Sequence, residues 1–385
     1  MKLLDAYLAQ KPLYYDKIDY ERFPNIYHKI QSYFQLPRII HLVGTNAKGS
    51  TGRALAHILQ KSGKSVGHYS SPHILKFNER IWLNGVDISD DILEVYHLKL
   101  QSILSEEDSK ALSYFEYTTL LAMLIFCDEC EYIVLEAGLG GEYDATNVFD
   151  KVLSIITPIG YDHQAFLGNT LQEIATTKIN SVRGDCLIAK QPESIVYEIA
   201  HNRVEKVKSN LYFAASYLEE DFYEKLLLHV KKNAYAEFLF DNFATAFCAY
   251  NLLGFEVNLK LLEGLELFGR CQKIAPNITI DVGHNPMAAE ALKSQFNGKK
   301  VILVYNSYND KEYEQILRIL SPIVLHVEIL PIDNVRALQK EKLHETLEKV
   351  GLSYSEFSKI QSDKEYLVFG SFSVIEAFLK GKFER

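Results

Sequence analysis

The chain of 385 residues is too long for one ordinary domain and long enough for two or three compact ones. Hydrophobic residues make up 48% of it and charged residues 24%, which permits sizeable cores and excludes a wholly disordered chain. The chain contains 41 Lys and Arg residues and 50 Asp and Glu residues, so its formal net charge is −9. This balance argues against a nucleic-acid surface but leaves room for a local basic cleft.

The composition also bears on location. Five cysteines in so large a chain suit a reducing cytoplasm better than a disulfide framework. Residues 1–17 carry charges and tyrosines instead of a basic stretch followed by an apolar one, so we expect no secretory signal. The longest apolar run, 120–127, is far shorter than the ~20 residues that a spanning helix needs. We therefore expect a soluble, cytoplasmic protein with no membrane partner.

Residues 38–157 alternate short β-branched runs with helical patterns, which predicts a parallel sheet covered on both faces. Strands are predicted at 38–43, 64–69, 131–135 and 151–157, and helices at 51–62, 118–127 and 170–178. Gly63 directly follows the first helix, as glycine commonly does at a helix end.

The alternation restarts near residue 272, which predicts a second, smaller α/β domain. Strands are predicted at 278–280 and 300–305, helices at 287–295 and 311–320, and the segments 324–330, 336–350 and 366–369 continue the alternation. We expect a first domain over 1–271 and a second over 272–385, with 269–272 as the hinge segment.

A loop of small residues joins the first predicted strand to its helix. It reads Gly44, Thr45, Asn46, Ala47, Lys48, Gly49, Ser50, Thr51. Small residues let backbone N–H groups turn towards phosphate oxygens, the helix start adds partial positive charge, and Lys48 adds a full one. The spacing departs from the standard Walker pattern, because Lys48 lies four positions after Gly44 instead of six. The alternative is a glycine-containing turn whose lysine points to solvent, but the flanking strand and helix favour a phosphate loop.

A carboxylate and three glycines follow the predicted strand at 131–135. Glu136 stands at the carboxyl end of this strand, near the phosphate loop, where its oxygens could hold Mg²⁺ directly or through water. Gly138, Gly140 and Gly141 could instead form a dinucleotide-binding turn, but no GxGxxG spacing follows. A merely flexible glycine loop is the remaining alternative.

Two further polar turns follow predicted strands. Asp162 and His163 come after the strand at 151–157; a lone histidine is more often structural, but the end of a parallel strand is where open sheets place ligands. In the second domain, Asp281 and His284 precede Asn285, which is a plausible helix N-cap before Pro286. Capping alone could explain that turn.

These segments, in this order, resemble the folylpolyglutamate synthase/dihydrofolate synthase family of the Mur ligase superfamily, over nearly the whole chain. The stretches similar to the family signatures are 41–51, 69–73 with 78–81, 135–147 and 160–168. The resemblance implies an α/β fold: a P-loop-type parallel sheet domain with a smaller Rossmann-like C-terminal domain.

The resemblance also implies roles for individual residues. ATP contacts fall on the loop from Gly44 to Thr51 with Lys48, and on Asn242, Arg270, Asp281 and His284. Two Mg²⁺ sites are implied, one at Ser71 and Glu136 and the other at His163, and a monovalent cation is a further candidate. Lys178 matches a lysine that is carbamylated in the family, and with Lys48 and His163 it forms the expected catalytic set. The implied pterin-binding residues are Phe115, Glu116, Thr118, Tyr143, Asp144 and Ala145.

Four departures from the family pattern are visible. Ala47 replaces the glycine usual before the lysine, which restricts φ there. Glu142 stands where the family often has arginine, and Val282-Gly283 replaces Gly-Ala. The segment 18–22 only partly matches the family's pterin-binding start.

The activity implied is ATP-dependent joining of L-glutamate to dihydropteroate and to reduced folates through an acyl phosphate, by a monomer. A monofunctional synthase and another Mur-type amino-acid ligase are the nearest alternatives. A non-catalytic nucleotide switch is an alternative from another class, and it would have no need of His163, Lys178 and Asp281.

Overall fold

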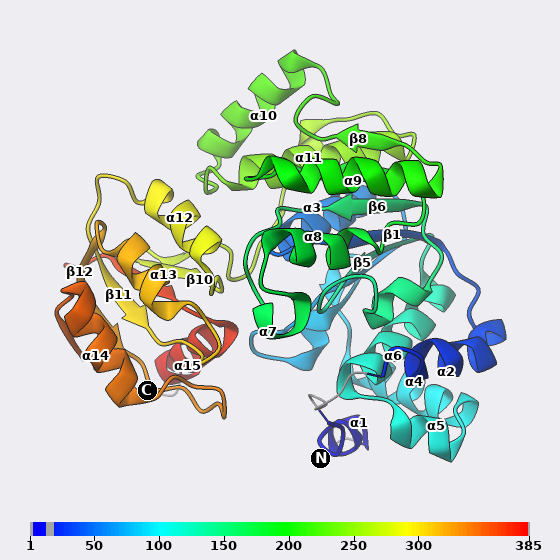
Figure 1. The fold of residues 1–385 in the computed structure, drawn as a ribbon, viewed down its shortest axis with the longest axis horizontal. Helices are drawn as coiled ribbons and strands as arrows, with labels where there is room; N and C mark the ends of the chain where they lie inside the picture. Colours follow the sequence, from blue (N-terminus) through cyan, green and yellow to red (C-terminus); the bar gives the residue numbers. More distant parts are fainter. Residues whose placement is uncertain (1–2, 13–18, 384–385) are drawn as a thin grey trace. The chain divides into compact units, whose positions relative to one another are not determined.

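The computed structural model describes residues 3–12 and 19–383 (Figure 1). Residues 1–2 and 13–18 therefore lie outside the described residues. They include part of the segment 1–17, in which we expect no secretory signal, and Ile18 of the partly matching segment 18–22.

The chain forms two compact units. One comprises Met1–Ile159, Asn169–Tyr223 and Asp241–Leu265, and the other comprises Gly160–Gly168, Glu224–Phe240 and Glu266–Arg385. The second unit thus takes in two short segments from the first 271 residues. The division after residue 271 stays a prediction.

An eight-stranded sheet forms the centre of the first unit. Its order is β4 (Val86–Asp87), β3 (Ile81–Leu83), β2 (Val66–Tyr69), β5 (Tyr132–Glu136), β1 (Arg38–Val43), β6 (Leu153–Ile156), β7 (Cys186–Ile188) and β8 (Leu211–Phe213). From β2 to β8 every neighbouring pair is parallel. The chain moves from β1 towards β2 through one helix and from β6 towards β8 through others, so the strand order reverses beside β1. Ligands of open α/β sheets bind at such a reversal.

The sheet is parallel, as expected, except at the edge formed by β3 and β4. Both pairs at this edge, β2 with β3 and β3 with β4, are antiparallel. The turn between them is Asn84-Gly85, with φ of 48° and 110°. An Asn-Gly pair with two positive φ angles is the preferred two-residue hairpin turn. The sequence therefore carries a signal for this hairpin, although we predicted no strands at 81–87.

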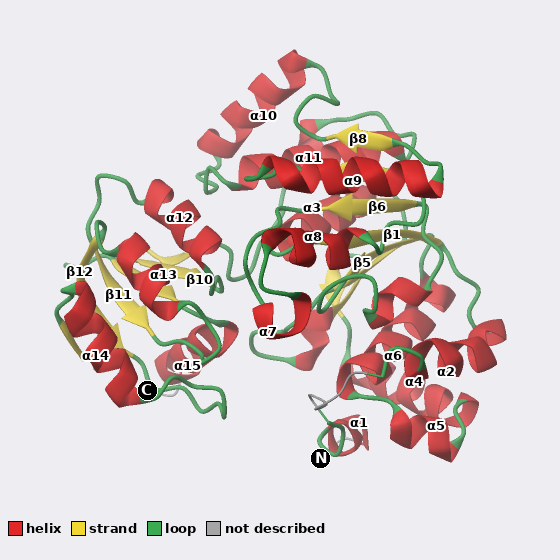
Figure 2. Ribbon diagram, in the orientation of Figure 1, coloured by secondary structure: helices red, strands yellow, loops and turns green. Residues whose placement is uncertain are grey.

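Helices cover both faces of this sheet. The helices mainly in the first unit are α1 (Leu3–Leu8), α2 (Arg22–Ile30), α3 (Lys48–Lys61), α4 (Asp90–Ile103), α5 (Glu106–Ala111), α6 (Tyr114–Glu129), α8 (Leu171–Ile179), α9 (Ser194–Val207) and α11 (Leu239–Leu252). Short 3₁₀ turns are η1 (Gln31–Tyr33), η2 (Phe77–Arg80), η3 (Ala145–Val148) and η4 (Leu259–Leu262). Figure 2 shows α8 and α9 in front of the sheet and α3 behind it, as right-handed crossovers in opposite directions require.

The core of the first unit explains why α6 forms where it does. Residues 117–126 of this helix are buried without interruption, so α6 is apolar on all sides and fills the space between the sheet and α4. A Cβ on Gly67 would lie only 2.3 Å from the Phe126 ring of this helix. The close approach of α6 to β2 therefore requires glycine at this position.

The second unit contains a six-stranded sheet. Its order is β13 (Tyr354–Glu356), β12 (Val324–Ile329), β11 (Val301–Tyr305), β14 (Tyr366–Phe369), β10 (Ile278–Asp281) and β9 (Gln272–Ala275), parallel except for the edge strand β9. Its helices are α7 (Gln164–Leu167), most of α10 (Glu220–Lys232), α12 (Pro286–Gln295), α13 (Tyr313–Leu320), α14 (Lys340–Val350) and α15 (Phe372–Phe383). The α/β class expected for both domains is confirmed.

Two local expectations are confirmed at helix ends. The helix α3 ends just before Gly63, which has φ of 87°. In the second unit, the Asn285 side chain accepts a hydrogen bond from the Ala288 N–H, and Pro286 takes the first helical position. Within the residues that the structure describes, no helix is both long and apolar enough to cross a membrane.

Candidate active site

The loop between β1 and α3 is held by the end of the neighbouring strand β6. The Thr45 and Asn46 N–H groups donate to the Pro158 carbonyl at 2.9 and 3.1 Å. A Cβ on Gly44 would lie 2.0 Å from the Thr157 hydroxyl oxygen, so only glycine fits there. The loop is therefore fixed in the crevice where the strand order reverses, with the first turn of α3 following directly.

Ala47 has a left-handed backbone, with φ of 67° and ψ of −5°, at the residue that precedes α3. We predicted that alanine would restrict φ here, and the loop nevertheless takes the conformation that glycine adopts most readily. A left-handed conformation costs a residue with a Cβ about 1 kcal/mol or somewhat more. The chain therefore carries local strain where the loop runs into α3.

We predict that Ala47→Gly raises the free energy of unfolding by about 0.5–1 kcal/mol, because it removes this strain. The matched control is Ala54→Gly, at a buried position in the middle of the same helix, where glycine should lower stability by about 1 kcal/mol. Urea titration of both variants measures the two effects. A loss of stability in both would contradict the assignment of strain to residue 47.

Lys48 and Glu136 converge on this loop. The Lys48 ammonium donates to the Gly44 carbonyl at 3.2 Å and lies 3.8 Å from a Glu136 carboxylate oxygen. Glu136 ends β5, where it pairs in register with Leu42 of β1, and its side chain is only 6% exposed. A buried carboxylate next to a lysine at a phosphate loop is a suitable partner for a hard cation.

The residues present fit a magnesium ion that is held mostly by phosphate oxygens and water. Among the described residues, no group of three or more His, Cys, Asp or Glu side chains could hold a metal by itself. Mg²⁺ commonly keeps several waters and takes only one or two protein ligands beside nucleotide phosphates. Glu136 offers one, and Ser71 follows β2, whose Tyr69 pairs with Leu135 of β5, so both end neighbouring strands.

Two further predicted residues lie at the same loop. The buried Lys178 ammonium donates to the Gly44 carbonyl at 3.0 Å, and a Cβ on Gly141 would lie 2.5 Å from the Lys178 carbonyl oxygen. On the other side, the Asn242 amide in α11 donates to the Ser50 hydroxyl at 2.9 Å. The structure thus brings Lys48, Glu136, Lys178 and Asn242 together around one loop, although they span almost 200 residues of sequence.

The predicted pterin-binding residues of α6 have defined structural partners. Glu116 completes a capping box with Ser113, and its carboxylate accepts two hydrogen bonds from the Arg22 guanidinium at 2.8 and 2.9 Å. Thr118 contacts the Tyr69 hydroxyl at 3.0 Å. The Phe115 ring lies against Gly138, where a Cβ would be 2.6 Å from it. The start of α6 is therefore packed directly on the glycine loop after Glu136.

The second pterin segment forms the end of that glycine loop. Tyr143 is 56% exposed, and its ring lies 4.2 Å from the equally exposed Tyr20 ring, centroid to centroid. Asp144 is buried and caps η3, accepting hydrogen bonds from the Leu139 and Thr146 N–H groups at 2.8 and 3.0 Å. Burial raises the pKa of Asp144 above its usual value, and the hydrogen bonds that the carboxylate accepts offset only part of this rise. Ala145 is buried beside it, so Tyr143 is the member of this segment that presents a surface to a ligand.

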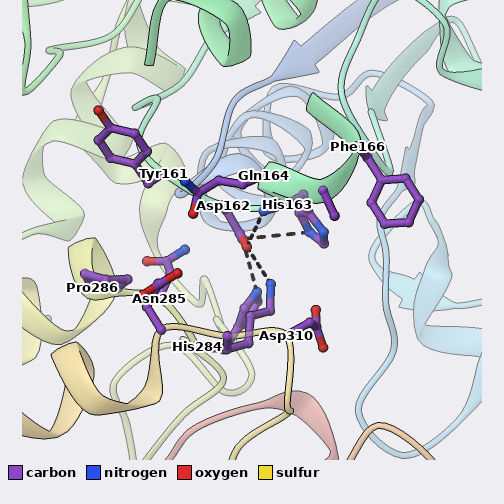
Figure 3. Close-up of a pocket in the computed structure, with 12 residues that line it drawn as sticks. Tyr161, Asp162, His163, Gln164, Phe166, His284, Asn285, Pro286 and Asp310 are labelled. Carbon is purple, nitrogen blue, oxygen red and sulfur yellow. Dashed lines mark hydrogen bonds and ion pairs between the residues drawn. The ribbon is translucent and has the colours of Figure 1, made fainter. Parts of the chain in front are cut away.

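In the second unit, three side chains meet at the carboxylate of Asp162. Asp162 accepts a hydrogen bond from Lys311 at 2.5 Å, and the ring nitrogens of His284 and His163 lie 3.6 and 3.8 Å from it. Burial raises the pKa of Asp162, but the hydrogen bond from His284 and the charges of His163, His284 and Lys311 together hold it well below its usual range. Figure 3 shows His163 and His284 directed towards the Asp162 carboxylate.

A cavity of about 170 Å³ surrounds this cluster and is lined by 161–166, 284–286 and 310–312. His163, the predicted ligand of the second Mg²⁺, has a left-handed backbone with φ of 53° and is about one-third exposed. Sequence analysis missed Lys311, because a lysine at the start of a predicted helix looks like an ordinary surface residue. Its side chain is in fact only 4% exposed.

Asp281 and Arg270 lie elsewhere in the same unit. The Asp281 carboxylate accepts hydrogen bonds from the Cys271 and Gly283 N–H groups, both at 2.7 Å, and burial raises its pKa. The Arg270 guanidinium lies over the Phe372 ring, 5.4 Å from its centroid. Asp281 therefore ties the predicted hinge segment to the end of β10, whatever else it contacts.

We predict that Asp162→Asn lowers the free energy of unfolding by about 3–5 kcal/mol, because the buried Lys311 loses its counter-charge. Adding Lys311→Met should restore much of this loss, since the double variant buries no unpaired charge. Urea titration of the wild type, both single variants and the double variant gives the coupling energy. Additive effects would contradict a direct ion pair.

Together, the fold and the loop define a phosphate-loop protein of the α/β class with a second parallel-sheet unit. No protein-family model matches the chain. The "Dihydrofolate synthase/folylpolyglutamate synthase" of Escherichia coli is 30% identical over 81% of this chain and 77% of its own. The solved folylpolyglutamate synthetase of Helicobacter pylori is 38% identical, with a TM-score of 0.78, over 99% of this chain and 98% of its own.

A third protein supports the fold. A bifunctional folylpolyglutamate synthase/dihydrofolate synthase of Yersinia pestis, solved with AMPPNP and a manganese ion, has a TM-score of 0.82 at 23% identity, over 99% of this chain and 97% of its own. The chain belongs to the dihydrofolate synthase/folylpolyglutamate synthase family, and it is an ATP-dependent ligase. The family resemblance noted in the sequence is thereby confirmed.

Proposed function

We propose that this enzyme joins L-glutamate to dihydropteroate and to reduced folates in the cytoplasm, using ATP and Mg²⁺. The observation that carries the proposal is the convergence of Lys48, Lys178 and Glu136 on the loop at Gly44. A loop with the Lys48 ammonium and the neighbouring buried carboxylate of Glu136 is suited to binding a nucleotide triphosphate together with a divalent cation. The exposed ring of Tyr143, close to the glycine loop, supports an aromatic substrate.

The reaction requires an activated acid, because a carboxylate does not condense with an amine at neutral pH. The γ-phosphoryl group of ATP passes to the substrate carboxylate and gives an acyl phosphate. The α-amine of L-glutamate then attacks the acyl carbon, phosphate leaves with the electron pair of the C–O bond, and the amine loses a proton. The protein's share is mainly positioning and neutralisation of charge.

The residues of the chain divide this work. Lys48 balances charge on the transferred group, and the N–H groups at the start of α3 bind phosphate oxygens. Glu136 and Ser71 would hold one Mg²⁺ and His163 a second, and the metal would neutralise phosphate charge. A carbamate on Lys178 would supply a further anionic ligand. The family resemblance also implies nucleotide contacts for Arg270, Asp281 and His284.

A phosphate-release assay tests the proposal. Dihydropteroate and tetrahydrofolate are each supplied with ATP and Mg²⁺, with and without L-glutamate. We expect phosphate release that requires both the pterin acid and glutamate, with equimolar amide product by mass spectrometry. Release with only one of the two acids would show a monofunctional enzyme, and release indifferent to both co-substrates would refute the ligase assignment.

A further inference from the structure

A chain of buried polar groups runs beside β1, behind the phosphate loop. His41 of β1 is fully buried, and its Nε2 lies 2.8 Å from the Thr146 hydroxyl. The Thr146 hydroxyl in turn contacts a carboxylate oxygen of Asp144 at 2.5 Å. On its other side, the His41 Nδ1 lies 3.4 Å from the Lys151 ammonium. Four side chains therefore link the glycine loop to β1.

The chemistry of these groups sets the direction of each hydrogen bond. A carboxylate only accepts, so the Thr146 hydroxyl donates to Asp144 and must accept from His41. His41 then carries its proton on Nε2 and leaves Nδ1 as the acceptor for Lys151. Burial, with the charges of Lys151 and Arg183, holds the pKa of His41 well below its usual range, which agrees with a neutral ring.

Lys151 joins three elements at this point. Besides His41, its ammonium donates to the Asn147 amide oxygen in η3 and to the Ser181 carbonyl, 3.3 Å away, just beyond α8. An ammonium has three N–H donors, and here all three have acceptors. Ser181 also donates its hydroxyl to the Lys178 carbonyl at 2.7 Å. One buried cation thus connects β1, the end of the glycine loop and the end of the helix that carries Lys178.

The charges around Lys151 oppose one another. Burial, together with the positive charges of Arg183 and Arg203, outweighs the attraction of Asp144 and Asp150 and lowers the pKa of Lys151 to about 7. A neutral amine has two N–H donors and cannot satisfy three acceptors. The contacts of Lys151 therefore weaken as the pH rises through about 7.

We propose that Lys151 is a positioning residue that, through His41, Thr146 and Asp144, fixes the glycine loop 138–147 for binding of the pterin acid. This inference rests on the proposed function, because it takes the pterin acid as the ligand of that loop. Lys151 touches neither the phosphate loop nor the surface of Tyr143, so it acts through the residues that it connects.

The test measures kcat and the KM values for dihydropteroate, ATP and L-glutamate in the wild type, Lys151→Met and Lys151→Arg, from pH 6 to 9. We expect Lys151→Met to raise the KM for dihydropteroate roughly tenfold, a size common for misplaced binding groups, with little change in the KM for ATP. The KM of Lys151→Met for dihydropteroate, divided by that of the wild type, should shrink above pH 7, because the wild type then loses the same charge. Lys151→Arg stays charged throughout. Its KM for dihydropteroate, divided by that of the wild type, should therefore fall as the pH rises.

Two controls separate a positioning role from a loss of stability. Val204→Ala removes buried volume from α9, outside the polar chain, and should lower stability without changing the KM for dihydropteroate. The ¹⁵N shifts of His41 report its tautomer without any assay of activity, and we expect the proton on Nε2 in the wild type. Three outcomes would overturn the inference. They are a change in the KM for dihydropteroate in Val204→Ala equal to that in Lys151→Met, a ratio of the Lys151→Met and wild-type KM values that does not vary with pH, and a proton on Nδ1 of His41. Failure of the proposed function would instead appear as absent glutamate-dependent turnover in the wild type.

Discussion

Replacing Lys48 with alanine is expected to lower kcat for ligation by about 10³-fold or more, while the enzyme stays folded. The reason is electrostatic: the ammonium lies 3.2 Å from the Gly44 carbonyl and 3.8 Å from Glu136, in a loop where phosphate charge must be neutralised. Because the charge on the transferred group is redistributed in the transition state, the loss should appear mainly in kcat. Steady-state phosphate release measures it.

The control for this prediction is Lys61→Ala, at the exposed end of the same helix α3. It removes an identical charge from the same element, so it reports any effect of helix stability or net charge alone. We expect Lys61→Ala to keep wild-type kcat. Retained activity in Lys48→Ala would refute the assignment of the phosphate loop.

Lys178→Ala is expected to lower kcat by about 10²-fold or more, and the chemistry that restores activity should reveal the state of this lysine. If Lys178 is carbamylated, a short carboxylic acid such as formate or acetate should restore turnover, because it replaces the missing anionic head. The Lys178 ammonium donates to the Gly44 carbonyl at 3.0 Å in the structure. If this free ammonium is the active form, a primary amine should restore turnover instead. The proposal predicts rescue by the acids.

Lys48→Ala is the matched control for the rescue experiment, since it lacks a lysine at the same loop. Carboxylic acids should not restore its activity, because its missing group is a cation. Rescue of Lys178→Ala by amines alone would contradict the carbamate. Rescue of both variants by acids would show a general salt effect and would contradict a specific role for the acid.

Local patterns were enough to predict much of the fold. The strand at 38–43 is predicted and observed with the same ends, because a buried parallel strand is a short, mostly apolar run, here interrupted by His41. The turn before α12 was also predictable, since capping by Asn285 and the first-turn Pro286 act within four residues. By contrast, the strands β7 and β8 and the helices α9 to α11 were not predicted.

The strand–loop–helix at 38–61, the carboxylate at the end of β5 and their order along the chain can be predicted from local patterns, because these features depend on contacts between near neighbours. Which distant groups meet follows from tertiary packing alone. Asp162 and Lys311 are 149 positions apart, and His41 and Lys151 are 110 apart. The energy of a buried ion pair or hydrogen bond depends on what surrounds it, and no period or spacing in the sequence carries that information.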